Sequence, residues 1–172
     1  HVDISFSNNG KFYKEKARLI IGADGAFSKV RRLSFPDHRF PKAYIAIQEW
    51  FETNQKVNYY GAVFDSQITD FYSWIIPKED YLIVGSALSL GTDVHERFNM
   101  LKSKLRKYGF KLNKSMGKNS AYLLRPLSTK EIVTGGGRVG LAGEAAGFIS
   151  PSSAEGISYA FRSALALSRS LK

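Results

Sequence analysis

The stretch Arg138-Val139-Gly140-Leu141-Ala142-Gly143-Glu144-Ala145-Ala146-Gly147 decides the fold. It reads as a short apolar strand that ends in a loop of small residues. A helix is predicted soon after it, with an apolar face that includes Ile157, Phe161 and Leu165. Small residues let backbone amides approach a ligand closely, and the start of a helix carries partial positive charge. We therefore predict an α/β unit with a ligand at this loop.

A second loop of the same character lies near the start of the chain. The apolar pair Ile20-Ile21 leads into Gly22-Ala23-Asp24-Gly25, and Ser28 to Arg32 follow. Asp24 can accept hydrogen bonds, and Arg31 can either fix the turn or meet a phosphate. Asp-Gly turns are common in ordinary strand-to-helix connections, so this loop alone does not identify a function.

Between the two loops the sequence predicts an antiparallel sheet. Four segments rich in aromatic and β-branched residues are separated by short polar breaks, at 44–51, 57–64, 71–76 and 81–88. Asp93 and Glu96 then form a capping box ahead of apolar positions at helical spacing, and Gly109 is expected to end that helix. At the start of the chain, Asn9-Gly10 between two extended runs predicts a hairpin.

Three segments resemble flavoproteins of the geranylgeranyl reductase type, within the larger group of aromatic-ring monooxygenases, flavin halogenases and lycopene cyclases. Residues 22–31 resemble the family's G-A-D-G-x-x-S-x-V-R signature. Residues 138–157 are similar to R-V-x-L-x-G-D-A-A-G, followed by a proline and a G-E-G-I turn. Residues 72–78 resemble the Y-x-W-x-F-P segment of prenyl reductases and the W-x-W-x-I-P segment of halogenases.

The resemblance implies that both small-residue loops contact FAD. The expected cofactor-binding residues are Gly22, Asp24, Gly25, Arg31, Gly143, Glu144, Ala145, Ala146, Gly147, Gly156 and Ile157. The helix that starts at Ile157 is expected to offer its positive end to the flavin. Two positions depart from the family pattern, because Glu144 replaces an aspartate and Ala154 replaces a glycine. Glu144 can still reach a ribityl hydroxyl if the backbone retreats by about 1.5 Å.

The aromatic segment predicts the substrate side of the site. Alternation places Tyr72, Trp74 and Ile76 on one face of a strand. An ordinary sheet core is the alternative reading of such a stripe. In the resembling family this face borders the substrate side of the flavin, so we expect Tyr72, Trp74, Ile76 and Pro77 to bind an apolar or aromatic substrate.

These expectations combine into an α/β (α+β) fold, a partial FAD/NAD(P)-binding Rossmann-like domain with an inserted antiparallel β-sheet substrate domain. The predicted segments are 1–33 and 126–172 for the FAD-binding domain and 34–125 for the substrate domain. The chain begins within a strand, ends within a helix and lacks the βαβ unit whose first turn carries G-x-G-x-x-G. We therefore expect an internal fragment that does not retain FAD and is inactive alone.

The expected function is that of an FAD-dependent oxidoreductase that reduces double bonds of a prenyl-type or other apolar substrate. NAD(P)H or ferredoxin is the expected electron donor. A flavin-dependent monooxygenase or halogenase of an aromatic substrate is the nearest alternative. The sequence identifies no catalytic residue and no oligomeric state.

The net charge of the chain limits the kinds of partner that can be expected. Lys and Arg outnumber Asp and Glu by 25 to 15, a net charge of +10, with a basic concentration between Lys102 and Lys118. A solvated helix face is the ordinary reading, and a non-catalytic basic module for nucleic acid or an anionic membrane is the alternative. No nucleic-acid-binding pattern is present, so no nucleic-acid partner is expected, whereas a peripheral membrane contact stays open.

Cysteine is absent, and the three histidines are scattered, so neither disulfides nor a metal site is expected. No apolar run approaches the ~20 residues that cross a bilayer, and no secretory signal is recognised. A soluble cytoplasmic protein is therefore expected.

Overall fold

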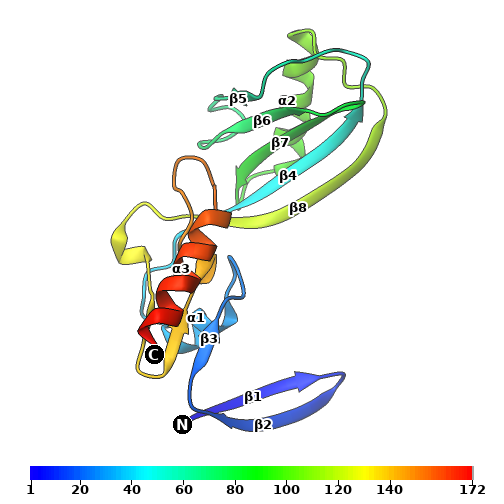
Figure 1. Cartoon of the computed structure of the whole chain (residues 1–172). Coiled ribbons are helices and arrows are strands. Elements are labelled where there is room, and N and C mark those ends of the chain that lie inside the picture. The colour runs from blue at the N-terminus through cyan, green and yellow to red at the C-terminus, as the bar shows by residue number, and fades with distance from the viewer. Residues whose placement is uncertain (172) are drawn as a thin grey trace. The chain divides into compact units, whose positions relative to one another are not determined.

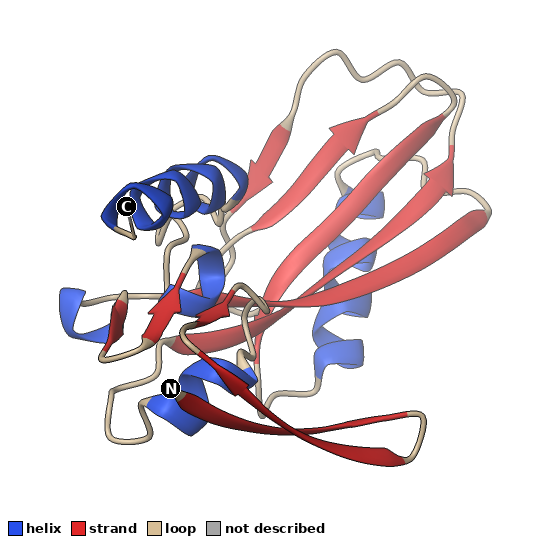
Figure 2. Cartoon of the chain, turned by 60° about the horizontal axis from the view of Figure 1, so that its bottom comes forward, coloured by secondary structure: helices blue, strands red, loops and turns tan. Residues whose placement is uncertain are grey.

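The computed structural model describes residues 1–171, which form two compact units. Unit 1 comprises His1–Lys42 and Leu124–Lys172, and unit 2 comprises Ala43–Leu123. Helices and strands are mixed, with one sheet that contains a parallel pair and a larger antiparallel sheet (Figures 1 and 2). The predicted fold class is confirmed.

Unit 1 is organised around a small sheet in which two distant segments of the chain pair in parallel. Its strands are β3 (Ile20–Gly22), β10 (Val139–Leu141) and β9 (Gly135–Gly136). In the parallel pair, Val139 lies opposite Ile20 and Leu141 lies opposite Gly22. Because parallel strands end at the same edge of a sheet, the loops that follow β3 and β10 emerge side by side.

Helix α1 (Lys29–Ser34) follows the loop after β3, and the 3₁₀ turn η2 (Gly143–Ala146) and helix α3 (Ile157–Ser170) follow β10. A further 3₁₀ turn, η1 (Thr129–Glu131), precedes β9. Helix α3 seats on η2 through Ser163, whose hydroxyl accepts a 2.8 Å hydrogen bond from the Gly143 amide.

The apolar face predicted for α3 is largely exposed in this structure. Ile157 and Phe161 are each 75% exposed and Leu165 is 52% exposed. Helix α3 instead packs against the small residues of β10 and η2 through Leu167, which lies against Gly140, and Ala160, which lies against Gly143.

The predicted hairpin is confirmed at the start of unit 1. Strands β1 (Val2–Asn8) and β2 (Lys11–Ala17) pair in antiparallel register. Asn9 has φ 48° and Gly10 has φ 76°, the two positive values that a type I′ turn requires. Phe6 and Tyr13 stack across the strands with ring centroids 5.1 Å apart.

Unit 2 is a five-stranded sheet covered on one face by a helix. The strand order is β5 (Gly61–Val63), β6 (Ser73–Pro77), β7 (Tyr81–Ser89), β4 (Lys42–Glu52) and β8 (Ser115–Arg125). Helix α2 (Val94–Lys107) lies along one face (Figures 1 and 2). Asp93 caps α2 by accepting a 2.8 Å hydrogen bond from the Glu96 amide, and Gly109 follows its end with φ 90°, as predicted.

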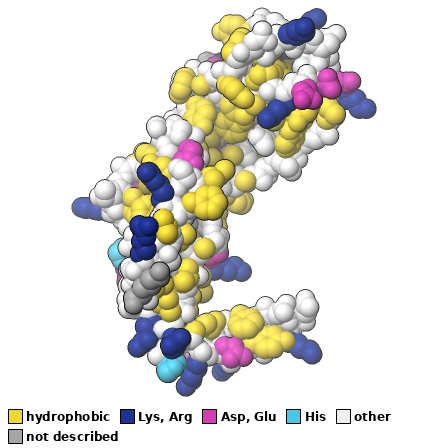
Figure 3. Space-filling model, in the orientation of Figure 1, with side chains coloured by type: hydrophobic (Ala, Val, Ile, Leu, Met, Phe, Trp, Pro, Cys, Tyr) yellow, Lys and Arg dark blue, Asp and Glu magenta, His cyan; other side chains and the backbone are white. Residues whose placement is uncertain are grey.

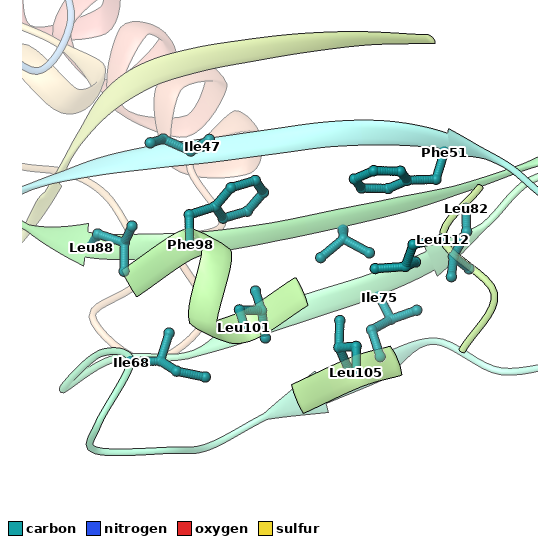
Figure 4. Packing of buried hydrophobic residues seen from close by; sticks show 11 residues of the cluster. Ile47, Phe51, Ile68, Ile75, Leu82, Leu88, Phe98, Leu101, Leu105 and Leu112 are labelled. Atoms are coloured by element: carbon teal, nitrogen blue, oxygen red, sulfur yellow. The ribbon is translucent and has the colours of Figure 1, made fainter. Parts of the chain in front are cut away.

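The core of unit 2 lies between α2 and the sheet (Figure 4). Phe98 and Leu101 of α2 are fully buried against Leu82, Val84 and Leu88 of β7. Burying side chains of this size contributes roughly 1.5–3 kcal/mol each. Because the helix covers only one face of the sheet, β4 and β6 keep partly exposed side chains on the other face.

Strand β8 is an element that the sequence did not predict. Its segment Ser115-Met116-Gly117-Lys118-Asn119-Ser120 carries no apolar alternation, and all six of these residues are exposed. The strand is fixed by its pairing beside β4 rather than by burial of its side chains.

None of the helices in residues 1–171 combines the length and the apolar character needed to span a membrane.

Candidate functional site

The two small-residue loops predicted to bind the cofactor meet at one edge of unit 1. The Ala142 amide, just after β10, donates a 3.0 Å hydrogen bond to the Gly22 carbonyl at the end of β3. The residues that follow, Ala23 to Gly25 and Gly143 to Gly147, therefore leave the sheet together. In α/β sheets this is the edge at which ligands bind, outside the carboxyl ends of parallel strands.

The eleven predicted cofactor-binding residues fall into two groups by exposure. Those with exposed or partly exposed surface are Asp24, Gly25, Glu144, Gly156 and Ile157. Those that are buried are Gly22, Arg31, Gly143, Ala145, Ala146 and Gly147. The buried group builds the support of the edge, and only the first group presents surface to a ligand.

Arg31 belongs to the support, and the prediction that it meets the cofactor is corrected. Its side chain is buried, with one terminal nitrogen donating to the carbonyls of Glu131 at 2.7 Å and Arg39 at 3.1 Å. The other terminal nitrogen lies 3.5 Å from the Ala145 carbonyl, and the guanidinium lies 4.9 Å from the ring centre of Phe40. A guanidinium enclosed by carbonyls is not accessible to a phosphate, so Arg31 fixes the turn.

Gly22 and Gly147 are buried for reasons of close packing. A side-chain carbon added to Gly22 would lie 2.5 Å from Leu141, and one added to Gly147 would lie 2.9 Å from the Glu131 carbonyl oxygen. Gly25 differs, because a carbon added there would have no neighbour within 4 Å. Gly25 is thus the glycine of the first loop that leaves open space beside the backbone.

The Asp24 carboxylate organises the start of α1. One oxygen accepts a 2.5 Å hydrogen bond from the Ser28 hydroxyl, and the other accepts from the amides of Lys29 at 2.7 Å and Val30 at 3.3 Å. Burial acts to raise the pKa of Asp24, but these hydrogen bonds together outweigh it and leave the pKa below its ordinary value. A carboxylate offers about four acceptor positions, so Asp24 keeps capacity for one further donor.

Glu144 reaches across the edge instead of projecting freely. Its Oε1 accepts a 2.6 Å hydrogen bond from the amide of Leu124, at the end of β8. Burial raises the pKa of Glu144, and the bond from Leu124 offsets part of that increase. The extra methylene of glutamate supplies this reach, since an aspartate on the same backbone would end about 1.5 Å short. Glu144 therefore ties η2 to the end of β8.

The segment before α3 carries the second departure from the family pattern. Ala154 has φ 55°, the left-handed conformation that a glycine adopts without cost. Next to it, the carboxylate of Glu155 accepts hydrogen bonds from the amide and the hydroxyl of Ser158, at 2.8 and 2.7 Å. These bonds lower the pKa of Glu155. Glu155 therefore takes the Ser158 amide at the start of α3, while Gly156 and Ile157 keep exposed surface there.

In unit 2 the predicted aromatic stripe lies on the face of the sheet opposite α2. Ser73 and Ile75 are buried, whereas Trp74 and Ile76 are partly exposed, which confirms the alternation. Tyr72 immediately precedes β6, and its ring lies 5.8 Å from that of Trp74. Burial raises the pKa of Tyr72.

Trp74 lies flat over Gly85. These two residues are paired across β6 and β7, and Gly85 is paired in turn with Gln48 of β4. A side-chain carbon added to Gly85 would lie 2.2 Å from the indole. The absence of a side chain at Gly85 therefore lets the indole rest on the sheet and form a flat aromatic platform.

A hollow of about 530 Å³ adjoins this platform. It is lined by Ala46, Gln48, Trp74, Asn119, Ser120 and Ala121. Within the described part of the chain, the side-chain amides of Gln48 and Asn119 have no hydrogen-bond partner. Neither residue was predicted from the sequence. The polar pair Gln48-Glu49 inside the otherwise apolar run 44–51 is the signal that marks Gln48.

Pro77 lies at the end of β6, paired with Leu82, and does not line the hollow. Among residues 1–171, no group of His, Asp and Glu side chains is arranged to hold a metal ion.

Comparisons with known proteins identify relatives of the chain. It is 46% identical over 148 residues to Protein CbrA of Escherichia coli (strain HS), which covers 86% of this chain and 40% of that protein. The identity to Protein CbrA of Shigella dysenteriae is also 46%, over 41% of its length. The chain thus spans about 40% of the length of the curated relatives it matches. No family model matches the sequence.

Solved structures share the fold. A geranylgeranyl bacteriochlorophyll reductase-like protein from Thermoplasma acidophilum superposes with a TM-score of 0.72 at 20% identity, over 90% of this chain and 40% of its own. The myxobacterial chondrochloren halogenase CndH gives 0.65 at 20% identity, over 98% and 42%. PqsL, a probable FAD-dependent monooxygenase from Pseudomonas aeruginosa, gives 0.58 at 17% identity, over 95% and 48%. The chain therefore has the fold of the FAD-dependent oxidoreductases that include geranylgeranyl reductase-like proteins, flavin-dependent halogenases and FAD monooxygenases.

Proposed function

We propose that this chain forms the second flavin-contacting part and the substrate sheet of an FAD-dependent oxidoreductase that reduces double bonds of a prenyl-type or other apolar substrate. One observation carries the proposal: the parallel pairing of β3 with β10 brings two loops with little side-chain bulk to one ligand-binding edge. The shared fold and the resemblance of both loops to flavin-binding signatures support FAD as the ligand.

The residues at this edge fit a flat, phosphorylated cofactor. Gly25 leaves open space beside the backbone, Asp24 keeps one acceptor position, and Glu144, in the loop after β10, carries a partly exposed carboxyl group. Gly156 and Ile157 complete the surface at the start of α3. FAD, when bound, supplies hydride and electron transfer. The chain's own contribution is to hold and orient the cofactor through backbone groups and these two carboxyls.

The sheet face of unit 2 supports an apolar substrate. Flat aromatic surface suits unsaturated or aromatic groups, and Tyr72 and Ile76 extend the Trp74 platform along β6. The reduction requires two electrons and two protons per double bond, with NAD(P)H or ferredoxin as the proposed electron source.

A second candidate function is monooxygenation or halogenation of an aromatic substrate. The observation that favours it is the pair of amides from Gln48 and Asn119 beside the platform. Such groups suit a substrate that carries hydroxyl or carbonyl oxygens on an aromatic ring, since each amide offers both a donor and an acceptor.

The cofactor proposal is tested by Gly25→Ala in a polypeptide extended to the length of the CbrA relatives. The added methyl group meets no protein atom, so the fold tolerates it at a cost of about 1–2 kcal/mol for the positive φ of 76°. FAD affinity, measured by flavin fluorescence quenching, is expected to fall by at least about tenfold, the equivalent of ~1.4 kcal/mol.

The matched control is Gly91→Ala in unit 2. Gly91 also has a positive φ, 86°, and no neighbour within 4 Å of an added carbon. This variant should bind FAD normally. Equal affinity of both variants for FAD would contradict the proposal that FAD binds at the β3–β10 edge.

The reaction is tested by reducing the flavin of the extended polypeptide under anaerobic conditions. Reoxidation by a prenyl lipid, with loss of one double bond per two electrons in the mass spectrum, is the expected result. Reoxidation only by oxygen, with an aromatic compound hydroxylated or halogenated, would favour the second candidate. The 172-residue chain alone is expected to be colourless after purification with FAD, and a stoichiometric yellow complex would contradict that expectation.

A further inference from the structure

Two loops of unit 2 present tyrosines and lysines on one surface, which we call the tip. The tip consists of Lys56, Tyr59, Tyr60, Lys107, Tyr108 and Lys111. Lys56, Tyr59 and Tyr60 come from the segment between β4 and β5, and the other three come from the end of α2 and the residues after it. Figure 1 shows these two segments at the same end of unit 2.

The two loops are held together by Gln55. Its side-chain nitrogen donates a 3.1 Å hydrogen bond to the Gly109 carbonyl, and its side-chain oxygen accepts a 2.9 Å hydrogen bond from the Lys111 amide. One amide group therefore bridges the segment that carries the first two tyrosines to the segment that carries Tyr108. These hydrogen bonds fix the two loops of the tip relative to each other.

The tip exposes an unusual amount of aromatic surface. Tyr59, Tyr60 and Tyr108 are 58%, 76% and 81% exposed. Tyr59 and Tyr108 also line a groove of about 540 Å³. The other side chains of the groove include Ile75, Leu101, Leu105 and Phe110. Exposed apolar side chains are common singly, but a cluster over an apolar groove marks a binding surface.

The structure separates the basic cluster predicted from the sequence into paired and unpaired cations. Lys102 forms an ion pair with Glu49 at 2.9 Å, and Lys104 forms one with Asp65 at 2.5 Å. The lysines of the tip differ, since within residues 1–171 none of the three has a carboxylate partner.

Two acidic residues lie near the tip. Asp65 lines the groove and is paired with Lys104, and Glu79 lines a small hollow with Tyr59, Tyr60 and Lys78, so that the formal charges of Glu79 and Lys78 cancel. The positive charge that remains on this surface is therefore carried by Lys56, Lys107 and Lys111. Figure 3 shows hydrophobic surface bordered by Lys and Arg side chains on unit 2.

We propose that the tip docks on the surface of an anionic phospholipid membrane. Tyrosine rings favour the boundary between headgroups and acyl chains, where one end of the side chain is apolar and the other hydrated. Unpaired lysines next to them gain about 1 kcal/mol each near an anionic leaflet. The apolar groove favours this partner over a nucleic acid, because it offers the phosphate backbone of a nucleic acid no cationic lining apart from the already paired Lys104.

The test is co-sedimentation of the full chain with phospholipid vesicles. Vesicles of phosphatidylcholine with about one third phosphatidylglycerol should bind the chain, and vesicles of phosphatidylcholine alone should bind it far less, because headgroup charge drives the contact. Replacing Lys56, Lys107 and Lys111 by alanine should lower the partition coefficient on the order of 100-fold, about fivefold per lysine. Tyr59→Ser with Tyr108→Ser should lower it on both kinds of vesicle.

The matched control uses the hairpin of unit 1. Lys11, Lys14 and Lys16 are also exposed, so changing all three to alanine removes the same charge from another surface. Phe12, 89% exposed on the same strand, provides the aromatic control as Phe12→Ser. These variants should keep nearly full vesicle binding. Circular dichroism and thermal melts verify that each variant is folded.

Three results would overturn the proposal. Equal losses in the tip and hairpin variants would mean that net charge alone drives adsorption. Undiminished binding by the tip variants would place the contact elsewhere. Tip-dependent binding to a single-stranded oligonucleotide without vesicle binding would identify a nucleic acid as the partner. None of these measurements uses FAD, so they are independent of the proposed reaction.

Discussion

The β3–β10 edge of unit 1, where we propose that the cofactor binds (the cofactor edge), and the aromatic face of unit 2 both depend on a glycine, but for opposite reasons. At Gly25 an added carbon would meet nothing within 4 Å, so the missing side chain leaves room for a partner from outside the chain. At Gly85 an added carbon would lie 2.2 Å from the Trp74 indole, so the missing side chain leaves room for a partner within the chain. Gly25 therefore leaves space for a ligand, whereas Gly85 leaves space for the Trp74 side chain.

This contrast distinguishes two ways of preparing a binding surface. The cofactor edge is built from backbone and two carboxyls, held from behind by the buried Arg31. The aromatic face is built from side chains laid on a rigid sheet, with Gln48 and Asn119 beside them. The cofactor edge is therefore sensitive to substitution of the buried residues that hold its backbone. The aromatic face is sensitive to substitution of the sheet residues on which its side chains lie.

The largest expected effect comes from removing the support of the cofactor edge. Arg31→Ala should destabilise unit 1 by about 3–5 kcal/mol, because it leaves the carbonyls of Glu131 and Arg39 without their charged donor. Hydrogen exchange followed by mass spectrometry should show faster exchange in β3 and β10 and unchanged exchange in β7. The neighbouring Arg32→Ala is the control, since Arg32 is exposed and should cost less than about 1 kcal/mol. Equal effects from the two variants would contradict the role assigned to Arg31.

The next largest effect on stability is expected from adding a side chain at Gly85, beneath the Trp74 indole. Gly85→Ala should destabilise unit 2 by about 1–3 kcal/mol and displace the Trp74 indole, because the added methyl group overlaps the ring. Denaturant unfolding and tryptophan emission measure both consequences. Gly61→Ala is the matched control in the same sheet, because a carbon added there lies 3.5 Å from Ile75, an ordinary contact.

A double variant sharpens this test. The double variant Trp74→Ala, Gly85→Ala should be less destabilised than the sum of the two single variants, since the clash disappears with the indole. If the two changes were simply additive, the indole would not lie on Gly85.

A smaller effect of opposite sign is expected at Ala154. Ala154→Gly should stabilise unit 1 by up to about 1 kcal/mol, because φ 55° is strained for alanine and not for glycine. The thermal melting temperature measures the change. Ala62→Gly in β5 serves as the control, where the backbone φ is not positive and glycine should destabilise. A lower melting temperature for both variants would show that Ala154 is not strained.

The smallest effect is confined to a range of pH. Glu144 has a pKa above its ordinary value of 4.5, so the folded protein binds a proton that the unfolded chain has already released. As the pH rises from 4.5 through the folded pKa, this carboxyl group subtracts stability, and above that pKa the loss is complete. Glu144→Gln removes the titration while keeping an oxygen for the Leu124 amide.

The stability of Glu144→Gln relative to the parent chain should therefore increase with pH across that range and then level off. Unfolding by denaturant at a series of pH values measures it. Glu144→Asp is the informative comparison, because it titrates but loses the reach to Leu124. A parallel pH profile for the parent chain and the Gln variant would contradict the raised pKa.

The sequence alone predicted the features that depend on neighbouring residues. The Asn9-Gly10 turn, the Asp93 cap and the alternation around Trp74 are encoded within a few positions of each other, so local geometry is enough to predict them. The polar edge strand β8 was missed, because a strand held by pairing beside β4 needs no apolar pattern of its own.

The candidate site divides in the same way. Its two loops were recognised from their small residues, and their meeting was required by the flavin hypothesis. Which of the eleven residues present surface was not predictable, because Arg31, Ala145 and Gly147 are buried by contacts with residues far away in the chain, such as Glu131. Gln48 and Asn119 became a pair only when β4 and β8 lined the same hollow.

By itself, the sequence determined the two small-residue loops, the aromatic stripe and the excess of positive charge. Only the tertiary structure decided that Arg31 supports the loops from behind, that Glu144 is tied to Leu124, and that Gln55 joins tyrosines and lysines into one surface. The physical reason is distance along the chain. Turns, caps and alternation depend on adjacent residues, whereas burial and side-chain hydrogen bonding depend on which remote segments the sheets bring together.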